Sequence, residues 1–204
     1  MTTLRTKHLT AWGFVSQLLF IFTLSTLSMT AEIPTNERAR LGQIEQSLKS
    51  DVPRVLCLDS SFATGGQPTD QAYAKAAAGG FHSVLSLRTA NEGVDLARER
   101  SLVEKNNLRY FNIPVASSAP RPAQADEFIR LVKEKSNHPM LINCASANRV
   151  GAFMMIFRML EQGWSEDKAL DEAVKIGMSS EGLKKFARDY IAQRRAKDGG
   201  NPGR

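Results

Sequence analysis

The sequence predicts an α/β fold in which a central, mainly parallel sheet of about four strands is flanked by helices. Short apolar runs alternate with amphipathic segments along the chain, a pattern typical of parallel strands joined by helical crossovers. The chain has 204 residues, enough for one domain with its own hydrophobic core. Its 42% hydrophobic and 24% charged residues match the composition of an ordinary globular protein.

Four short apolar runs are the predicted strands. Each is bounded by turn residues, and glycines and a proline within residues 65–68 separate the first strand from the helix that follows it. The predicted strands cover residues 54–58, 82–87, 110–115 and 140–143. In a parallel sheet, ligands bind outside the carboxyl ends of the strands, so a site is expected in the loops that follow these runs.

The segments between and after the strands are the predicted helices. Ser165 is an expected N-cap, and Gly79 and Gly177 are expected helix stops. The helix over residues 150–162 is apolar almost all round, which indicates that it is buried. The predicted helices cover residues 70–78, 94–107, 122–136, 150–162, 165–176 and 181–195.

The first 31 residues have the layout of a secretory signal peptide. Arg5 and Lys7 precede an apolar run over residues 11–27, and small residues follow at 28–31. We therefore expect export and cleavage near Ala31, which would place the protein in the periplasm or outside the cell. The alternative is an uncleaved membrane anchor, although polar residues make the run marginal for spanning about 30 Å of hydrocarbon.

Three further segments follow the leader. Residues 32–50 are polar and helix-compatible and are the predicted N-terminal arm. Residues 51–196 form the predicted domain. Residues 197–204 include three glycines and a proline, so we predict a disordered tail.

The charge pattern limits the classes of partner. The formal net charge is +6, but the basic residues are spread over the chain rather than gathered in a stripe with interleaved aromatics. This distribution argues against nucleic-acid binding. A mild positive charge suits an anionic substrate. His82 and His138 are isolated, so the sequence indicates no metal site, and it indicates no cofactor.

The segment LINCASANRVGAF places Cys144 and Arg149 between a predicted strand and the buried helix, with four residues between them. A tight loop there can direct several backbone N–H groups toward one point, and the helix start adds partial positive charge. Arg149 can hold two oxygens of a tetrahedral anion in a fork. The same groups favour the thiolate of Cys144, which is the nucleophilic form. The alternative is a buried structural cysteine with an arginine on a loop.

Four motifs within residues 54–165 resemble the bacterial dual-specificity-phosphatase-like family that includes the phosphatase-like domain of beta-lactamase-hydrolase-like proteins. They occur in the family's order and at matching intervals. The motifs are GGQPT, GGFHSVLSLRTANEG, RYFNIPV and NCASANRVGAF. The resemblance implies a cysteine-phosphatase fold, with Cys144 as nucleophile, Arg149 as the phosphate-binding residue, and a phosphorylated protein or small molecule as substrate.

Further roles follow from the same resemblance. The loop residues that would supply backbone N–H groups to the phosphate are Ala145, Ser146, Ala147 and Asn148. Arg88 and Glu92, at the end of the second predicted strand, would contact the substrate or support the residues that do. The alternative for Arg88 is a surface salt bridge with Glu92.

The loop departs from the pattern of protein tyrosine phosphatases at several positions. Those enzymes carry His where this chain has Asn143, one residue more between Cys and Arg, and Ser or Thr where this chain has Val150. Relatives in the family named above share the shorter spacing but usually carry Gly at the position of Ala147. If that position requires a positive φ, Ala147 adds modest strain. Ser146 is a candidate to replace the missing hydroxyl.

The general acid is the residue that the sequence identifies least well. Tyrosine phosphatases use an Asp on the loop after the third strand, but residues 115–122 contain no carboxylate here. Asp59, Glu92 and Asp126 are the candidates. Without an acid, the rate for poor leaving groups would fall by about 10²–10⁴, and activated aryl phosphates would suffer less.

Two other functions stay open. A rhodanese-like sulfurtransferase also uses a short cysteine loop, with four residues before an Arg, and forms a persulfide. A second alternative is a loop that binds phosphate or a phosphorylated partner with little turnover, which Asn143, Ala147 and the missing acid make credible. The other cysteine, Cys57, is either a packing residue or a partner for Cys144 in a disulfide that would switch off the nucleophile.

Overall fold

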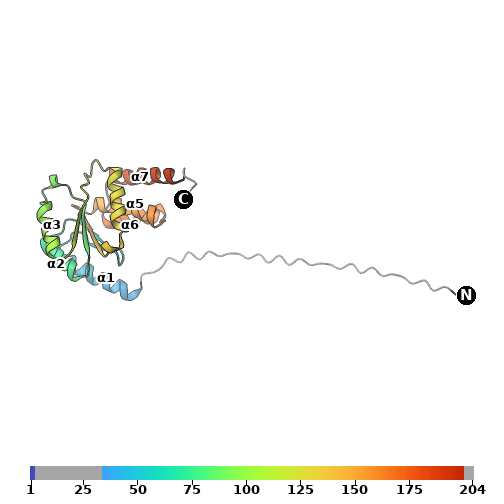
Figure 1. Cartoon of the computed structure of the whole chain (residues 1–204), viewed down its shortest axis with the longest axis horizontal. Coiled ribbons are helices and arrows are strands. Elements are labelled where there is room, and N and C mark those ends of the chain that lie inside the picture. The colour runs from blue at the N-terminus through green and yellow to red at the C-terminus, as the bar shows by residue number, and fades with distance from the viewer. Residues whose placement is uncertain (3–33, 200–204) are drawn as a thin grey trace. The chain divides into compact units, whose positions relative to one another are not determined.

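The computed structural model describes residues 1–2 and 34–199. A compact unit begins at Ile33 and holds every described helix and strand (Figure 1). The predicted leader, residues 1–31, lies outside the described residues except for its first two, so export stays a prediction. Among the described residues, no helix is both long and apolar enough to cross a membrane.

Within residues 34–199, five strands form one sheet in the order β1-β2-β5-β3-β4. The strands are β1 (Leu56–Cys57), β2 (Phe62–Gly65), β3 (Ser83–Ser86), β4 (Arg109–Asn112) and β5 (Met140–Asn143). All neighbouring pairs are parallel except β1 and β2, which are antiparallel. The predicted α/β class with a mainly parallel sheet is confirmed. β5 has the predicted bounds, and β2 is a strand that the sequence did not predict.

The composition of β2 explains why it escapes prediction. Phe62 is its only large apolar residue, and Ala63, Thr64 and Gly65 follow. β2 lies between β1 and β5, and all four of its residues are buried. A Cβ atom on Gly65 would lie 2.3 Å from Cγ1 of Val52. Close packing therefore selects small residues here, and the usual hydrophobic signal of a strand is lost.

In the described part of the chain, seven α-helices flank the sheet. They are α1 (Thr35–Leu48), α2 (Asp70–Ala78), α3 (Leu96–Lys105), α4 (Pro122–Lys133), α5 (Asn148–Glu161), α6 (Glu166–Ile176) and α7 (Glu181–Gly199), with 3-10 turns η1 (Ala90–Glu92) and η2 (Lys135–Asn137). The predicted ends of α6 are confirmed. Ser165 Oγ accepts a hydrogen bond from Lys168 N, and Gly177 ends the helix with a φ of 138°.

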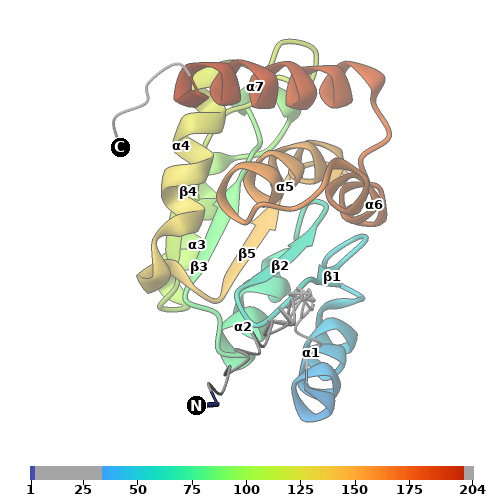
Figure 2. The same ribbon diagram turned by 90° about the vertical axis from the view of Figure 1, so that its right-hand side faces the viewer.

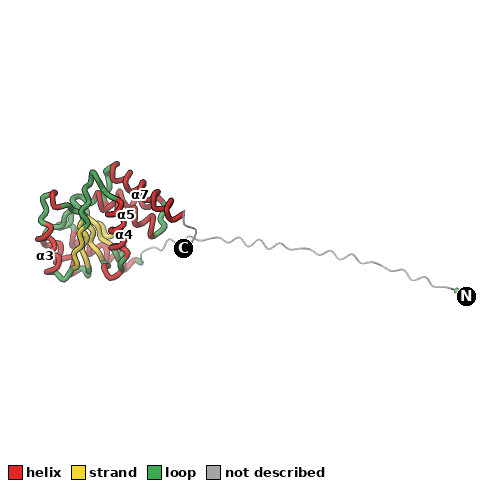
Figure 3. The backbone as a smooth tube through the Cα atoms, turned by 45° about the horizontal axis from the view of Figure 1, so that its top comes forward, coloured by secondary structure: helices red, strands yellow, loops and turns green. Residues whose placement is uncertain are grey.

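The helices cover both faces of the sheet (Figures 2 and 3). One apolar layer lies under α1, α2 and α3 and includes Leu48 and Tyr73. The other lies under α4 to α7 and includes Phe128 and Phe153. α5 is the central helix of this second layer, and every residue from Arg149 to Met159 is buried, as its apolar pattern predicted.

The predicted N-terminal arm and C-terminal tail differ from the observed structure. α1 belongs to the predicted arm of residues 32–50, yet Leu48 is fully buried and Glu45 Oε2 accepts a hydrogen bond from Cys57 N at 2.9 Å. The arm is therefore part of the compact unit. The predicted tail began at residue 197, but α7 continues to Gly199, because neither Lys nor Asp breaks a helix and Lys197 complements the helix dipole.

Candidate active site

The Cys144 loop (residues 144–149) lies at the carboxyl edge of the sheet, where β5 ends and α5 begins. Gly65 of β2 and Ser86 of β3 both pair with Asn143, so three parallel strands end at the level of the loop. β5 is fully buried in the middle of the sheet, and α5 is buried from Arg149 onward. Both ends of the loop are thus fixed, in the position that the sequence predicted.

The turn after β2 supports the loop from one side. Gln67 N donates to Ala145 O at 3.2 Å, and Gly66 forms an isolated β-bridge with Ser146. A Cβ atom on Gly66 would lie 3.0 Å from Ala145 O, so this close approach favours a glycine. The GGQPT motif therefore stabilises the conformation of the Cys144 loop.

Ala147 bends the loop into the first turn of α5. Its backbone is left-handed, with φ 67° and ψ −2°, which confirms the strain expected from the family's preference for Gly. A non-glycine residue in this conformation costs about 1–2 kcal/mol. Around the bend, Ala145 and Ser146 are exposed, whereas Cys144 and Arg149 are only 1% and 2% exposed.

The guanidinium of Arg149 is held along one edge. Nη1 and Nη2 each donate to one carboxylate oxygen of Glu92 at 2.6 Å. Nη1 also donates to the backbone oxygens of Leu87 and Val115, at 2.9 and 2.6 Å. Within residues 34–199, Nε of Arg149 donates to no protein acceptor. A tetrahedral anion in the loop can therefore take Nε and the second proton of Nη2 as a fork.

Cys144 lies within electrostatic reach of this guanidinium. Burial lowers the pKa of Arg149, but Glu92 and Cys144 outweigh burial and raise the pKa above its ordinary value. The loop thus combines a buried thiol, a permanent cation with a free hydrogen-bonding edge, and the positive end of α5. Such a site can bind a tetrahedral oxyanion and present its central atom to the sulfur.

Glu92 is a carboxylate rather than an acid in this arrangement. Burial raises its pKa, but hydrogen bonds from Arg149 and from the backbone and hydroxyl of Thr89 outweigh burial and lower the pKa of Glu92 to about 2. Thr89 N and Oγ1 both donate to Oε1 at 2.9 Å. Glu92 therefore carries no proton at neutral pH, which does not fit the general-acid role considered for it.

Arg88 pairs with Glu92, as the alternative interpretation held, although the pair is not a surface one. The Arg88 side chain is only 9% exposed, and its Nε lies 2.9 Å from Glu92 Oε2. Nη2 donates to Glu92 O and Nη1 donates to Gln67 Oε1, both at 2.8 Å. The structure thus brings Arg88 next to Glu92, where it supports the residue that holds Arg149.

The other two candidate acids are engaged elsewhere. Asp59 precedes β2 and lies at the amino edge of the parallel strands, opposite the Cys144 loop, where its carboxylate pairs with Arg158 at 3.0 Å. Asp126 lies on α4 and accepts hydrogen bonds from Tyr190 and Arg194 of α7, at 2.7 and 2.6 Å. The structure brings neither of them to the loop.

Asn148 connects the loop to the turn between α6 and α7. Its Oδ1 accepts hydrogen bonds from Ser179 N and Ser180 N, at 3.0 and 3.3 Å. The side chain therefore supports the loop, in addition to any contribution of its backbone to phosphate binding. Sequence reasoning missed this role, and that of Thr89, because neither residue belongs to a pattern that predicts its partner.

The two cysteines are free thiols. Cys57 packs against the layer under α1, α2 and α3, whereas Cys144 lies in the layer under α4 to α7. Burial raises the pKa of Cys57 to about 12. These positions on opposite faces of the sheet favour the packing interpretation of Cys57 over the disulfide. Among the described residues, no group of three or more His, Cys, Asp or Glu could hold a metal ion.

Comparison with known families decides what kind of domain this is. Residues 37–192 match the family described as "DSP-PTPase phosphatase fused to NAD+ Kinase". The chain belongs to this family. The DSP-PTPase match runs from α1 into α7 and includes the Cys144 loop. No curated protein sequence matches the chain.

Solved structures of cysteine phosphatases share the fold of this DSP-PTPase chain. The active form of Tk-PTP is 20% identical, with 69% of this chain and 98% of that chain covered and a TM-score of 0.60. A cysteine-to-serine variant of TpbA from P. aeruginosa, in complex with pTyr, is 19% identical (70% and 89% covered, TM-score 0.58). The core catalytic domain of the PP-IP phosphatase SIW14 from S. cerevisiae, in complex with citrate, is 15% identical (74% and 96% covered, TM-score 0.59).

Proposed function

We propose that the protein is a cysteine-dependent phosphatase that hydrolyses phosphate monoesters through a phosphocysteine intermediate. One observation carries the proposal. Cys144 starts a loop that ends in the buried Arg149, whose Nε edge is free while Glu92 holds the opposite edge. Membership of the DSP-PTPase family supports the same reaction. The alternative of a rhodanese-like sulfurtransferase has no comparable support.

The reaction has two steps. The Cys144 thiolate attacks phosphorus, an S–P bond forms, the P–O bond to the leaving group breaks, and the leaving oxygen takes up a proton. A water molecule then attacks phosphorus, the S–P bond breaks, and inorganic phosphate and the thiolate are released. Arg149 and the backbone N–H groups of the loop bind the phosphoryl oxygens as charge builds up on them.

Leaving groups that need no protonation suit this site best. The segment after β4 offers only exposed, uncharged residues from Ala116 to Ala119, and Glu92 is ionised. A missing general acid costs about 10²–10⁴ in rate for poor leaving groups. We therefore propose aryl phosphates, such as phosphotyrosine, as better substrates than alkyl phosphates. The pTyr in the TpbA structure is consistent with this class of substrate.

Hydrolysis of an aryl phosphate by the purified domain tests the function. We expect measurable turnover by the wild-type protein and loss of at least about 10³-fold in Cys144→Ser and Arg149→Ala, since both residues act on the phosphoryl group. Glu127→Gln, which removes a carboxylate from the α4 surface, is the control and should keep wild-type activity. Wild-type activity in Cys144→Ser would exclude the proposed mechanism.

A phosphate-binding protein with little turnover is the second candidate. It is favoured by the lack of a carboxylate after β4 and by the engagement of Asp59 and Asp126 elsewhere. Vanadate binding in the micromolar range together with no hydrolysis of p-nitrophenyl phosphate would establish it. Thiosulfate:cyanide transfer measured in the same preparation separates both candidates from a sulfurtransferase.

We propose, finally, that the domain acts outside the cytoplasm. The motivation is the basic and apolar layout of residues 1–31. Cell fractionation of a tagged full-length chain, with mass spectrometry of its N-terminus, tests this. An intact N-terminus in the cytoplasmic fraction would contradict it, and an intact N-terminus in the membrane fraction would indicate an uncleaved anchor.

A further inference from the structure

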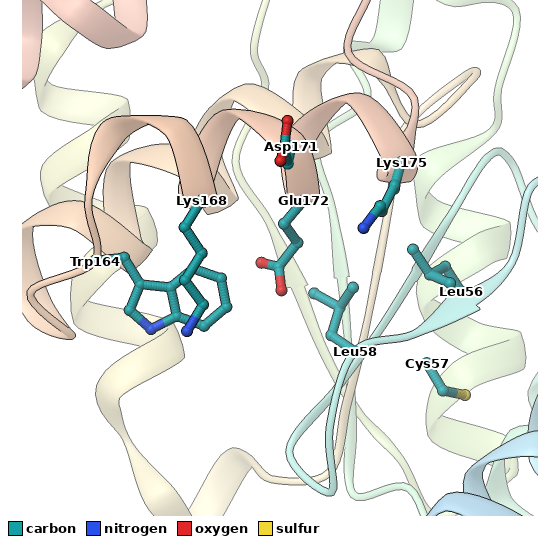
Figure 4. A pocket seen from close by; sticks show the side chains of 8 residues that line it. All are labelled: Leu56, Cys57, Leu58, Trp164, Lys168, Asp171, Glu172 and Lys175. Atoms are coloured by element: carbon teal, nitrogen blue, oxygen red, sulfur yellow. The ribbon is translucent and has the colours of Figure 1, made fainter. Parts of the chain in front are cut away.

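A groove lies between the edge strand β1 and helix α6 and encloses about 330 Å³ (Figure 4). We call it the β1–α6 groove. The side chains that define it are Leu56, Leu58, Trp164, Lys168, Glu172 and Lys175. Figure 4 shows α6 along one side and β1 along the other, with Cys57 directed away from the space between them. None of these residues has a part in the proposed chemistry.

The groove leads toward the Cys144 loop. Lys175 lies in the last turn of α6, and Gly177 ends that helix. The point where a Cβ atom of Gly177 would lie is 2.8 Å from Nη1 of Arg54 and 3.2 Å from Ser146 O. Arg54 also precedes β1 by two residues. The guanidinium of Arg54 thus lies between one end of the groove and the exposed part of the loop.

The unpaired charge along this path is mostly positive. Within residues 34–199, neither Arg54 nor Lys175 forms an ion pair, and both are exposed. The carboxylate of Glu172 is paired with the buried Arg158, at 2.7 and 3.1 Å, and Arg158 is shared with Asp59. Asp171 is the acid left at the rim of the groove. A partner that supplies carboxylates near Arg54 and Lys175 would complement this path.

The floor of the groove is apolar, and at its far end the indole ring of Trp164 is contacted by the cations of Lys168 and Arg158. Leu56, Leu58 and Trp164 are partly buried and pack on the core layer under α4 to α7. Lys168 covers the indole ring of Trp164, with Nζ 3.7 Å from the ring centroid. The Cys57 N–H on the edge strand is already bonded to Glu45 on α1, so a partner here would be recognised through its side chains rather than by strand addition.

We propose that the β1–α6 groove binds an extended peptide segment on one side of a phosphorylated residue, so that the natural substrate is a phosphoprotein rather than a small phosphomonoester. This inference rests on the proposed function, because the phosphorylated residue is placed in the Cys144 loop. The 11 residues of α6 make a groove of roughly 16 Å, which holds about five extended residues. An acidic residue beside the phosphorylated one would meet Arg54 and Lys175, and an apolar residue about four positions away would meet Leu58 and Trp164.

Two sets of phosphotyrosine peptides test the groove, and they differ in the side of the phosphotyrosine that carries the recognised residues. One set carries Glu next to phosphotyrosine and Leu four positions away on the N-terminal side, and the other set carries them on the C-terminal side. The measured quantity is kcat/KM for each peptide divided by kcat/KM for p-nitrophenyl phosphate. For one direction only, we expect this ratio to exceed that of a matched Ser-substituted peptide by about tenfold.

Variants of the groove should lower this ratio. A single exposed charge pair affects binding by a small factor, so Lys175→Glu should lower the ratio for the favoured peptide by about fivefold. Trp164→Ala should lower it by about tenfold, because it removes the largest apolar surface of the groove. Lys105→Glu reverses the charge of an exposed lysine at the end of α3, on the opposite face of the sheet, and should leave the ratio as in the wild type.

The outcomes separate this inference from the proposed function. Two results would exclude peptide binding in the β1–α6 groove without contradicting the proposed phosphatase activity. In one, the wild type turns over p-nitrophenyl phosphate without any peptide preference, and in the other, both groove variants retain the preference of the wild type. Absence of all turnover would overturn the phosphatase, and the groove would then be judged by binding to Cys144→Ser. That variant should bind the favoured peptide about tenfold more tightly than free phosphotyrosine, and equal affinity would exclude the groove.

Discussion

At the residue scale, the candidate site depends on an ion pair between Arg149 and Glu92, which are 57 positions apart in the chain. The position of Arg149 could be predicted, because its spacing from Cys144 and its place before an apolar helix are local features. The partner of Arg149 could not be predicted. For an acidic residue shortly after a strand, no sequence pattern distinguishes a structural carboxylate from a catalytic acid. Only the fold shows that both oxygens of Glu92 are used to hold the guanidinium.

The lowered pKa of Glu92 predicts how stability depends on pH. Its folded pKa of about 2 lies below the ordinary value of 4.5, so the ionised carboxylate stabilises the folded state fully above about pH 4.5. This contribution is lost as the pH falls toward 2. Solvent screening of the partly exposed carboxylate reduces it, and we expect about 1–2 kcal/mol. Urea unfolding of the wild type and Glu92→Gln between pH 2 and pH 7 measures it.

The two proteins should differ in free energy of unfolding above pH 4.5 and converge only as the pH falls to about 2. Glu127→Gln is the matched control, because Glu127 also binds an arginine through both oxygens, at 2.6 and 2.8 Å, but on the surface of α4. Its effect should stay below about 0.5 kcal/mol. A constant difference between wild type and Glu92→Gln over the whole range would contradict the assigned pKa.

At the element scale, the direction of the short strand β1 determines where the candidate acid Asp59 lies. Residues 54–58 were predicted as a strand, but β2 was not, so the hairpin that joins them was missed. β1 is antiparallel to β2, and the chain therefore leaves β1 at the amino edge of the parallel strands. Asp59 is at that edge, far from the Cys144 loop. The direction of a strand depends on the strand with which it pairs. Because β2 is only weakly apolar, the sequence does not reveal that β1 pairs with it.

The close contact between α5 and α6 predicts the effect of a substitution at Gly151. A Cβ atom on Gly151 of α5 would lie 2.5 Å from Ala173 O and 2.8 Å from Cβ of Met178. Gly151→Ala should therefore lower the free energy of unfolding by about 1–3 kcal/mol, although alanine is the better helix former. Since α5 starts at the Cys144 loop, we expect the affinity for vanadate to fall as well. Thermal unfolding and vanadate titration measure the two effects.

Gly42 in α1 is the matched control for this change. It is exposed, and nothing lies within 4 Å of the position of its Cβ atom. Gly42→Ala should raise the free energy of unfolding by about 0.5–1 kcal/mol, through helix propensity alone. Opposite signs for the two glycine-to-alanine changes are required. Stabilisation by Gly151→Ala would mean that α5 and α6 do not approach as closely as the structure shows.

At the scale of the whole molecule, the alternation of strands and helices was sufficient to predict the class of fold, since every predicted strand and helix corresponds to an observed one. The outer limits of the folded unit were harder to predict. Residues 32–50 have too few apolar residues to indicate a core helix. Leu41 and Leu48 are the buried residues of α1, and Ile44 packs on the core layer beside Leu48. A helix with so narrow an apolar face is indistinguishable in sequence from a solvated arm.

The role of α1 gives the prediction at this scale. A chain that starts at residue 51 loses the fully buried Leu48 and the Glu45 carboxylate that binds Cys57 N. Removing a buried leucine side chain alone costs about 2–5 kcal/mol, so this chain should be less stable by at least about 3 kcal/mol. A chain that starts at residue 34 keeps α1 and should match the protein cleaved after Ala31. Urea unfolding of the three chains measures the difference, and equal midpoints for the chains starting at residues 34 and 51 would show that α1 is a dispensable arm.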